Sequence, residues 1–315
     1  MERVERTPVT GVARPAAESR RPGTEDEVDL IPVRTYWQLV RQRFVQHRLA
    51  VIALFILVVL ITAAVIIPTL TGDQYRLSNV ARSNGAATIE APLGFNQIGQ
   101  NLGIRLAKAT QTSLIIGFAA VFIIVGLGTL VGSIAGFAGG LVDNILMRFV
   151  DIVLSLPVLF IILMIVSFFG QGDVRVVIIA IGITGWTLAA RLIRAEFLTL
   201  READFVQAAR ALGAGSRRII LRHMLPAAMA PLVVAAALGV ADSVVVEAAL
   251  SFLGYGISPP DASLGNLLND AQTTFFRNPE RALYPGTVLV LIVLCASFLG
   301  DGLRDALDPR QRIES

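Results

Sequence analysis

The chain has 315 residues, of which 54% are hydrophobic and 16% are charged, and its formal net charge at pH 7 is +3. Soluble domains carry about a quarter charged residues, so this composition excludes an ordinary soluble domain and, with several long apolar runs, indicates a membrane protein. The arginines follow the edges of those runs, which argues against nucleic-acid binding. One cysteine (Cys295) excludes an internal disulfide, and two distant histidines (His47 and His223) do not complete a zinc site with it.

The N-terminal region precedes the first apolar run. Residues 1–33 are rich in Pro, Gly, Arg and Glu without an apolar period, which predicts a disordered tail. This tail is not a secretory signal, because no small-residue cleavage site follows the first apolar run. Residues 34–48 place Trp37, Val40 and Phe44 on one stripe among arginines, which predicts an interfacial helix. A basic stop before the first span is an equally good interpretation.

Apolar runs predict six transmembrane helices, at roughly 49–67, 110–136, 147–169, 174–195, 227–250 and 284–303. Arginines concentrate before the first run, between the fourth and fifth runs, and at the C-terminal end. The positive-inside rule therefore places both termini and the 196–226 loop in the cytoplasm, and the loops 68–109 and 251–283 outside. The sequence thus predicts an all-α integral membrane fold, with residues 49–315 as one six-span domain.

Glycine and proline punctuate these predicted spans. Gly128, Gly132 and Gly136 recur every fourth residue, so they lie on one helix face and are predicted to let another helix approach closely. Pro157 in the third span and Pro231 in the fifth are predicted to kink or loosen their helices, which neighbouring helices can tolerate.

Acidic residues within spans are costly and call for a partner. Asp151 follows Arg148 by three residues, which predicts an ion pair along the helix. Asp242 and Glu247 are separated by about 140° around the fifth span, so they do not share a face. Both are candidate pore or gate residues, and a satisfied packing contact is the competing interpretation.

The stretch QAARALGAGSRRIILRHMLP, residues 207–226, lies between the fourth and fifth spans. Phe205, Ala208, Ala209 and Leu212 form one apolar stripe, and Gly213 predicts the end of that helix. A second helix, capped by the serine at 216 and ended or bent by the proline at 226, completes a helix–turn–helix elbow. The elbow is either a solvated basic loop or a docking surface for a cytoplasmic partner.

This stretch resembles the EAA motif of ABC importer permeases. Glutamine replaces the motif's glutamate, and His223 stands where isoleucine is usual. Segments 91–99, 139–157, 247–268 and 300–310 resemble the C-type permease subunit of dipeptide, oligopeptide and nickel importers. The resemblance implies an ATPase-coupling surface formed by Gln207, Ala208, Ala209, Arg210, Gly213, Leu225 and Pro226.

The resemblance also implies the fold and the partners. It implies a type I ABC importer permease fold with a cytoplasmic coupling helix, in a bacterial or archaeal cell membrane. The chain would pair with a different, B-type permease subunit, with two ATP-binding subunits and with an extracytoplasmic peptide-binding protein. It would itself contain no catalytic residue, metal ligand or cofactor, and the partner subunits would bind ATP and Mg. The chain's single lysine, in Ala107-Lys108-Ala109, does not form a phosphate-binding Gly-Lys-Ser/Thr loop.

Three alternatives stay open at this stage. An importer of nickel or a metal chelate belongs to the same family, although few histidines and cysteines argue against bare-metal coordination. An ion-gradient-driven secondary transporter is a different class, and its paired repeats are not found. An intramembrane hydrolase has only weak support from Ser258. The departures within 91–101, and at Leu264 where relatives have tryptophan, leave the contacts of the outer loops unassigned.

Overall fold

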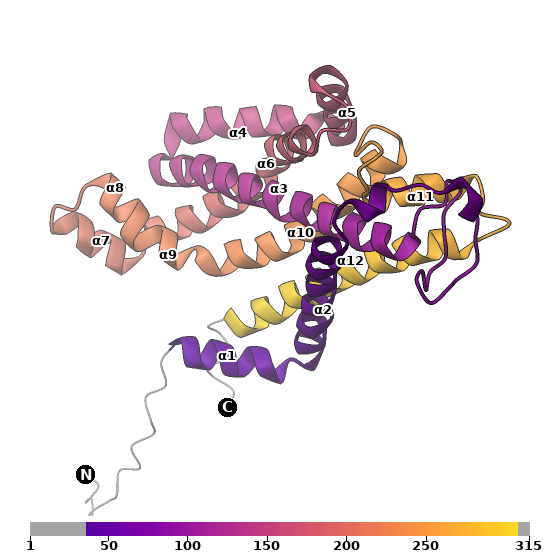
Figure 1. Ribbon diagram of the computed structural model, residues 1–315. Coiled ribbons are helices and arrows are strands. Elements are labelled where there is room, and N and C mark those ends of the chain that lie inside the picture. Colours follow the sequence, from indigo (N-terminus) through magenta and orange to yellow (C-terminus); the bar gives the residue numbers. More distant parts are fainter. Residues whose placement is uncertain (1–35, 308–315) are drawn as a thin grey trace, which may run out of the picture. The chain divides into compact units, whose positions relative to one another are not determined.

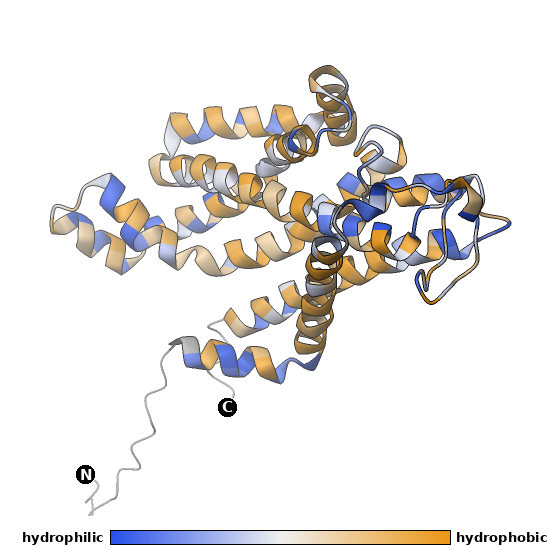
Figure 2. Ribbon diagram, viewed as in Figure 1, coloured by the Kyte–Doolittle hydropathy of each residue, from blue (hydrophilic) through white to orange (hydrophobic). Residues whose placement is uncertain are grey.

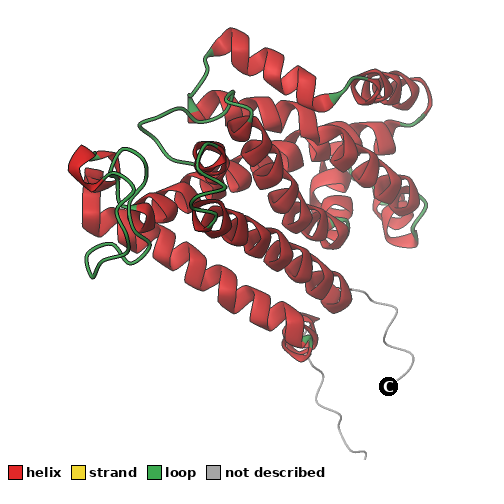
Figure 3. Ribbon diagram, turned by 90° about the vertical axis from the view of Figure 1, so that its right-hand side faces the viewer, coloured by secondary structure: helices red, strands yellow, loops and turns green. Residues whose placement is uncertain are grey.

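The computed structural model describes residues 36–307, and their side chains from residue 38 onward. The predicted tail at 1–33, the start of the predicted interfacial helix and residues 308–315 lie outside this range. Within it the regular structure is helical and includes no strand (Figure 3). The helices are α1 (Tyr36–Gln46), α2 (Arg48–Thr71), η1 (Gly72–Arg76), η2 (Val80–Arg82), α3 (Leu102–Ala138), α4 (Gly140–Ser155), α5 (Val158–Phe169), α6 (Val174–Arg201), α7 (Asp204–Ala211), α8 (Ser216–Ile219), η3 (Ile220–Met224), α9 (Leu225–Ala227), α10 (Met229–Phe252), α11 (Leu264–Gln272) and α12 (Glu280–Leu307).

Five segments within 36–307 are long and apolar enough to cross a membrane: α2 with η1, α3, α6, α10 and α12. A sixth crossing is formed if α4 and α5, which meet at 83°, make one span together. All six predicted runs are therefore helical. Figure 2 shows α2 coloured as hydrophobic along most of its length, whereas α7 and α8 alternate between polar and apolar residues. Such an all-round apolar helix suits contact with lipid.

Of the two prolines in the predicted spans, Pro157 breaks its helix and Pro231 does not. At Pro157 the predicted single helix 147–169 is broken into α4 and α5, a sharper change than the predicted kink. Proline lacks an N–H and its ring clashes with the carbonyl four residues earlier, so the helix restarts after it. Pro231 causes no break, because it is the third residue of α10. The first four N–H groups of a helix have no intrahelical acceptor, so its missing donor costs nothing there.

Helix α3 begins earlier than the sequence predicts. The side chain of Asn101 accepts hydrogen bonds from the backbone N–H groups of Gly103 (3.0 Å) and Ile104 (3.3 Å), so the helix starts at Leu102 and not near 110. Its 37 residues span about 55 Å at 1.5 Å per residue. A membrane core is about 30 Å thick, so α3 is tilted or extends beyond it. Part of the predicted 68–109 loop is therefore helical.

Helices α3 and α6 run side by side and share the most extensive helix contact in the described chain (Figure 1). The segment 204–227, which we call the elbow, contains α7, α8, η3 and α9 and lies at one end of this pair. The 72–101 loop and α11 lie at the opposite end, which we call the loop end. The predicted 251–283 loop thus contains a helix, α11, that the sequence analysis did not predict.

Candidate functional site

The first half of the elbow is α7, which ends through its glycine. Gly213 has a φ of +78°, a conformation that glycine adopts without steric cost. Its N–H donates to the carbonyl of Arg210 at 2.9 Å, and the N–H of Ala214 donates to the carbonyl of Ala209 at 3.0 Å. This pair of hydrogen bonds satisfies two of the carbonyls at the end of the helix. The helix therefore ends where the sequence predicts.

The second half of the elbow departs from the prediction at its start. Gly215 is the N-cap residue of α8, and no side chain caps the helix, so the predicted cap by Ser216 is wrong. From α8 the chain passes through the π-helical turn η3 into α9, which includes Pro226 and ends one residue after it, at Ala227. A π turn closes its hydrogen bonds one residue later than an α turn. We attribute the tolerance of Pro226 to this wider turn, which relieves the clash with the preceding carbonyl.

The elbow is anchored to the spans by buried apolar residues. Val206 of α7, Ile219 of α8 and Met224 of η3 pack in one cluster with Ile193 and Phe197 of α6. All five side chains are almost fully buried. These contacts hold both halves of the elbow against α6.

The opposite face of the elbow is exposed and apolar. Leu212 is 89% exposed and Phe205 is 44% exposed, and Leu221 of η3 is also exposed. Phe205, Ala208 and Leu212 of the predicted stripe are therefore exposed, whereas Ala209 packs against the buried cluster and Val206 takes the fully buried position on α7. An exposed apolar surface of this kind is typical of a protein-interaction site.

Polar groups surround this exposed face. The guanidinium of Arg210 lies 5.5 Å from the ring centroid of Phe137, at the end of α3. Gln207, the residue that replaces the motif's glutamate, donates from its amide nitrogen to the backbone carbonyl of Arg201 at 3.2 Å. Arg217 and Arg218 of α8 are exposed. The elbow thus exposes basic side chains together with the apolar ones, and the acidic Asp204 is exposed on α7 as well.

The two candidate pore residues on α10 lie in different surroundings. Glu247 is fully buried and accepts hydrogen bonds from the hydroxyls of Ser113 on α3 (2.6 Å) and Ser251 (2.7 Å). The Ser113 hydroxyl in turn accepts from the N–H of Leu264, the first residue of α11. Glu247 therefore connects α3, α10 and α11. Asp242, by contrast, is exposed on the surface of α10. A pore or gate role stays a prediction for both.

The three glycines that recur every fourth residue in α3, Gly128, Gly132 and Gly136, face α6. A Cβ atom built at each of them would lie 2.5–2.6 Å from an atom of α6, which is well below van der Waals contact. For Gly132 that atom is the backbone carbonyl oxygen of Ala190, which cannot rotate away. The two helix backbones thus approach at a distance that a side chain at these positions would prevent.

Two cross-helix ion pairs join α4 to α6. Asp143 pairs with Arg194, and Asp151 pairs with Arg191. The predicted pairing of Asp151 with Arg148 is therefore wrong. Because α4 lies alongside α6, an arginine of the neighbouring helix approaches Asp151 directly, and spacing within α4 alone could not reveal it.

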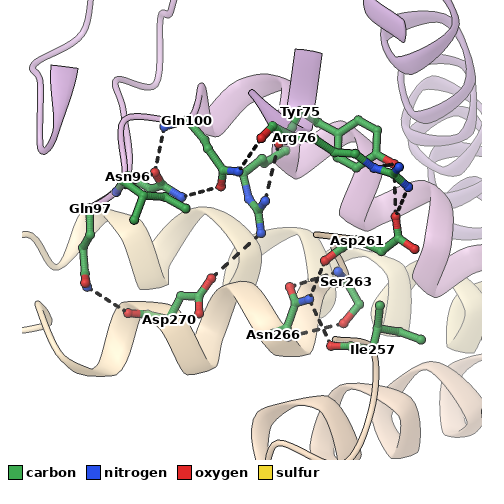
Figure 4. Close-up of polar contacts among 12 residues, drawn as sticks. Tyr75, Arg76, Asn96, Gln97, Gln100, Ile257, Asp261, Ser263, Asn266 and Asp270 are labelled. Carbon is green, nitrogen blue, oxygen red and sulfur yellow. Dashed lines mark hydrogen bonds and ion pairs between the residues drawn. The ribbon is translucent and has the colours of Figure 1, made fainter. Parts of the chain in front are cut away.

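The segment that follows α10 is stabilised by internal hydrogen bonds. Asn266 of α11 donates to the carbonyls of Ile257 (3.2 Å) and Asp261 (3.0 Å) and accepts from the N–H of Ser263 (3.0 Å) (Figure 4). The Ser263 hydroxyl accepts from the N–H of Asn266, which completes a capping box at the start of α11. Serine and asparagine at this spacing were the sequence signal for α11.

An ion pair connects this segment to the 72–101 loop. Arg76 donates to the carboxylate of Asp261 at 2.7 Å, and the Tyr75 hydroxyl donates to the same oxygen at 3.1 Å (Figure 4). Partial burial acts to raise the pKa of Asp261, but these hydrogen bonds outweigh it and hold the pKa below its ordinary value. The carboxylate therefore stays ionised at neutral pH.

A bundle of apolar spans with a helical elbow at one end defines a multi-span membrane protein. The family model described as "Binding-protein-dependent transport system inner membrane component" matches residues 128–313, and the "N-terminal TM domain of oligopeptide transport permease C" matches residues 35–87. The chain therefore belongs to the family of binding-protein-dependent transport system inner membrane components.

Individual relatives agree with this assignment. The chain is 36% identical over 281 residues to the oligopeptide transport system permease protein OppC of Haemophilus influenzae, covering 89% of this chain and 90% of that protein. It is 37% identical over 281 residues to OppC of Escherichia coli K12, covering 89% and 93%. It is 38% identical over 276 residues to OppC of Mycobacterium tuberculosis H37Rv, covering 87% and 94%.

A solved structure shares the fold. An inward-facing form of the MetNI methionine ABC transporter aligns with a TM-score of 0.54 at 19% identity, covering 65% of this chain and 97% of that chain. The resemblance to importer permeases that the elbow indicated is thus confirmed, and the fold is that of a type I ABC importer permease.

Proposed function

We propose that the chain is the C-type permease subunit of an ATP-driven importer of short peptides. The observation that carries this proposal is the elbow, which exposes apolar and basic side chains and is fixed by buried contacts to α6. The names of its relatives supply the substrate, because those named here are oligopeptide transport permeases.

The elbow couples ATP hydrolysis to transport in this proposal. Each of two partner subunits binds ATP and Mg, and one of them receives the coupling residues at 207–210, 213 and 225–226. When the two ATP-binding subunits close, the elbow moves with them. The cluster around Phe197 carries the movement to α6, and the glycine contact with α3 carries it further into the bundle. Packed helices move as rigid bodies, so the pore alternates between inward and outward access.

The distribution of charged residues supports the proposed membrane topology and partners. The arginine distribution supports a cytoplasmic elbow and cytoplasmic termini, with the loop end facing a peptide-binding protein outside. The exposure of Asp242 on α10 supports pairing with a second permease subunit. A charge facing lipid near the middle of a span costs about 2.5–3.5 kcal/mol or more, so an exposed Asp242 is better placed in an aqueous pore or against a second, B-type subunit.

The alternatives gain less support. Residues 36–307 contain no group of three His, Cys, Asp or Glu side chains able to hold a metal ion, and a metal chelate as cargo would not need one. Family membership favours ATP-driven transport over an ion-gradient mechanism.

Two substitutions test the coupling role. Gly213→Pro cannot adopt a φ of +78° and loses the hydrogen bond to Arg210. Arg210→Glu reverses the charge beside the exposed face, and Arg210→Lys is its matched control. We expect Gly213→Pro and Arg210→Glu to assemble in the membrane but to hydrolyse ATP without peptide uptake, and Arg210→Lys to transport normally. Normal uptake by both disruptive variants would reject the docking role of the elbow.

A further inference from the structure

The loop end contains a cavity of about 540 Å³. It is bounded by the 72–101 loop, the first turns of α3, the Pro259–Pro260 turn, α11 and the start of α12. Pockets for small molecules commonly measure about 300–1,000 Å³, so the cavity is large enough for a short peptide or a metabolite. Amide side chains line it, including Asn96, Gln97 and Asn269.

Arg105 in the wall of this cavity lacks close partners. The residue is 2% exposed, so its guanidinium is removed from water. Its Nη1 donates one long hydrogen bond, of 3.4 Å, to the carbonyl of Tyr75, and its Nη2 lies 3.9 Å from the carboxylate of Asp270. Its Nε has no hydrogen-bond partner within residues 36–307. A buried charge ordinarily has its donors satisfied, because leaving them unpaired is costly.

A second buried arginine adds to the positive charge. Arg281 is 7% exposed and donates to the side-chain oxygen of Asn84 (2.7 Å) and to the carbonyl of Phe95 (3.0 Å), both uncharged. No ion pair joins it to any carboxylate among the described residues. Three arginines and one aspartate line the cavity, and Arg76 already has its own partner outside the lining, so the wall carries an excess of positive charge.

We propose that the loop-end cavity binds a carboxylate group, which pairs with the guanidinium of Arg105. Arginine recognises carboxylates through charge-assisted, often bidentate hydrogen bonds. The carrier is the free C-terminus of a short peptide, whose backbone amides match the amide side chains of the wall. This choice of carrier rests on the proposed function, whereas the carboxylate itself follows from the charges of the cavity.

The proposal makes a second prediction, which concerns Asp270. Its carboxylate is half-exposed and is the acidic group nearest to Arg105 in the lining. An incoming carboxylate is repelled by Asp270 and competes with it for the same guanidinium. Removing the charge of Asp270 should therefore tighten the binding of a carboxylate, although it removes a side chain from the site.

Binding to the purified permease complex, prepared without its binding protein, tests the proposal by titration calorimetry. The probes are tri-alanine with a free carboxylate, tri-alanine amide and sodium acetate. We expect the free acid to bind at least tenfold more tightly than the amide, and Arg105→Gln to abolish this difference. Arg82→Gln is the matched control, because Arg82 is exposed, pairs with Glu90 and lies outside the cavity; it should leave the difference intact.

The variant Asp270→Asn keeps the test decisive even if Arg105→Gln fails to fold. We expect it to bind the free acid several-fold more tightly and the amide unchanged. Acetate that displaces the peptide at equal affinity would support the carboxylate site and overturn the peptide as its carrier. Equal binding of acid and amide, or weaker acid binding by Asp270→Asn, would overturn the carboxylate site. If ATP-dependent peptide uptake stayed normal in such a complex, the permease proposal would still stand.

Discussion

The substitution Gly132→Ala tests the contact between α3 and α6 most sharply. A Cβ at this position lies 2.5 Å from the Ala190 carbonyl oxygen and 2.9 Å from the Ile193 Cβ, whereas ordinary contacts begin at 3.4 Å. The two helices must therefore separate by roughly 1 Å, and such overpacking costs about 1–3 kcal/mol. Alanine recovers about 0.5–1 kcal/mol through its better helix propensity. The net expectation is a loss between about 0 and about 2.5 kcal/mol, centred near about 1 kcal/mol.

Gly126→Ala is the matched control on the same helix, because nothing lies within 4 Å of a Cβ built at Gly126. We expect this variant to be as stable as the parent chain or slightly more stable. The assay is thermal unfolding in detergent. At roughly 2–4 °C per kcal/mol, Gly132→Ala should lower the midpoint by several degrees. Equal midpoints for the two alanine variants would refute the claim that backbone proximity requires glycine at position 132.

Three further substitutions test polar contacts. Asp143→Asn should destabilise the chain by about 1–3 kcal/mol, because it leaves the partly buried Arg194 without its carboxylate. Adding Arg194→Gln should recover part of that loss in a double-mutant cycle. Strict additivity of the two substitutions would contradict the pairing. Asn266→Ala removes three hydrogen bonds at a cost of about 2–4 kcal/mol, and should speed proteolysis within 253–279. An unchanged rate of proteolysis would contradict the stabilising role of Asn266. Asp261 has a lowered pKa, so its ion pair with Arg76 stabilises the fold above pH 3.8, and this stabilisation is lost as the pH falls through the folded-state pKa. Asp261→Asn should therefore flatten the acid side of a plot of stability against pH. An unaltered plot would show that the ion pair contributes little.

The sequence predicted the spans because membrane helices depend mainly on local composition. A run of about 20 apolar residues satisfies its own backbone hydrogen bonds and needs no information from elsewhere in the chain. The predicted helix limits were wrong where a polar capping residue determines the start of a helix. The cap at Asn101 extends α3 by about two turns, which contain Arg105 and Lys108, and the capping box at Ser263 starts a helix in a segment that was predicted to be a loop.

The elbow was predicted for a different reason. Gly213 ends its helix by a local mechanism that one residue determines, and the motif around it is specific to a family. The faces of the elbow were not predictable, because the choice between Val206 and Phe205 as the buried residue depends on the position of α6. The same holds for Asp151, whose partner comes from another helix, and for Arg105, whose lack of partners depends on the surrounding loops.

One measurement tests the coupling role of the elbow most directly: site-specific photo-crosslinking within the assembled transporter. A photoreactive residue is placed at Leu212, the most exposed apolar side chain of the elbow, or at Ile98, which is exposed at the loop end. The proposed function predicts that position 212 crosslinks to an ATP-binding subunit and that position 98 does not. Crosslinks to that subunit from position 98, with none from position 212, would contradict it.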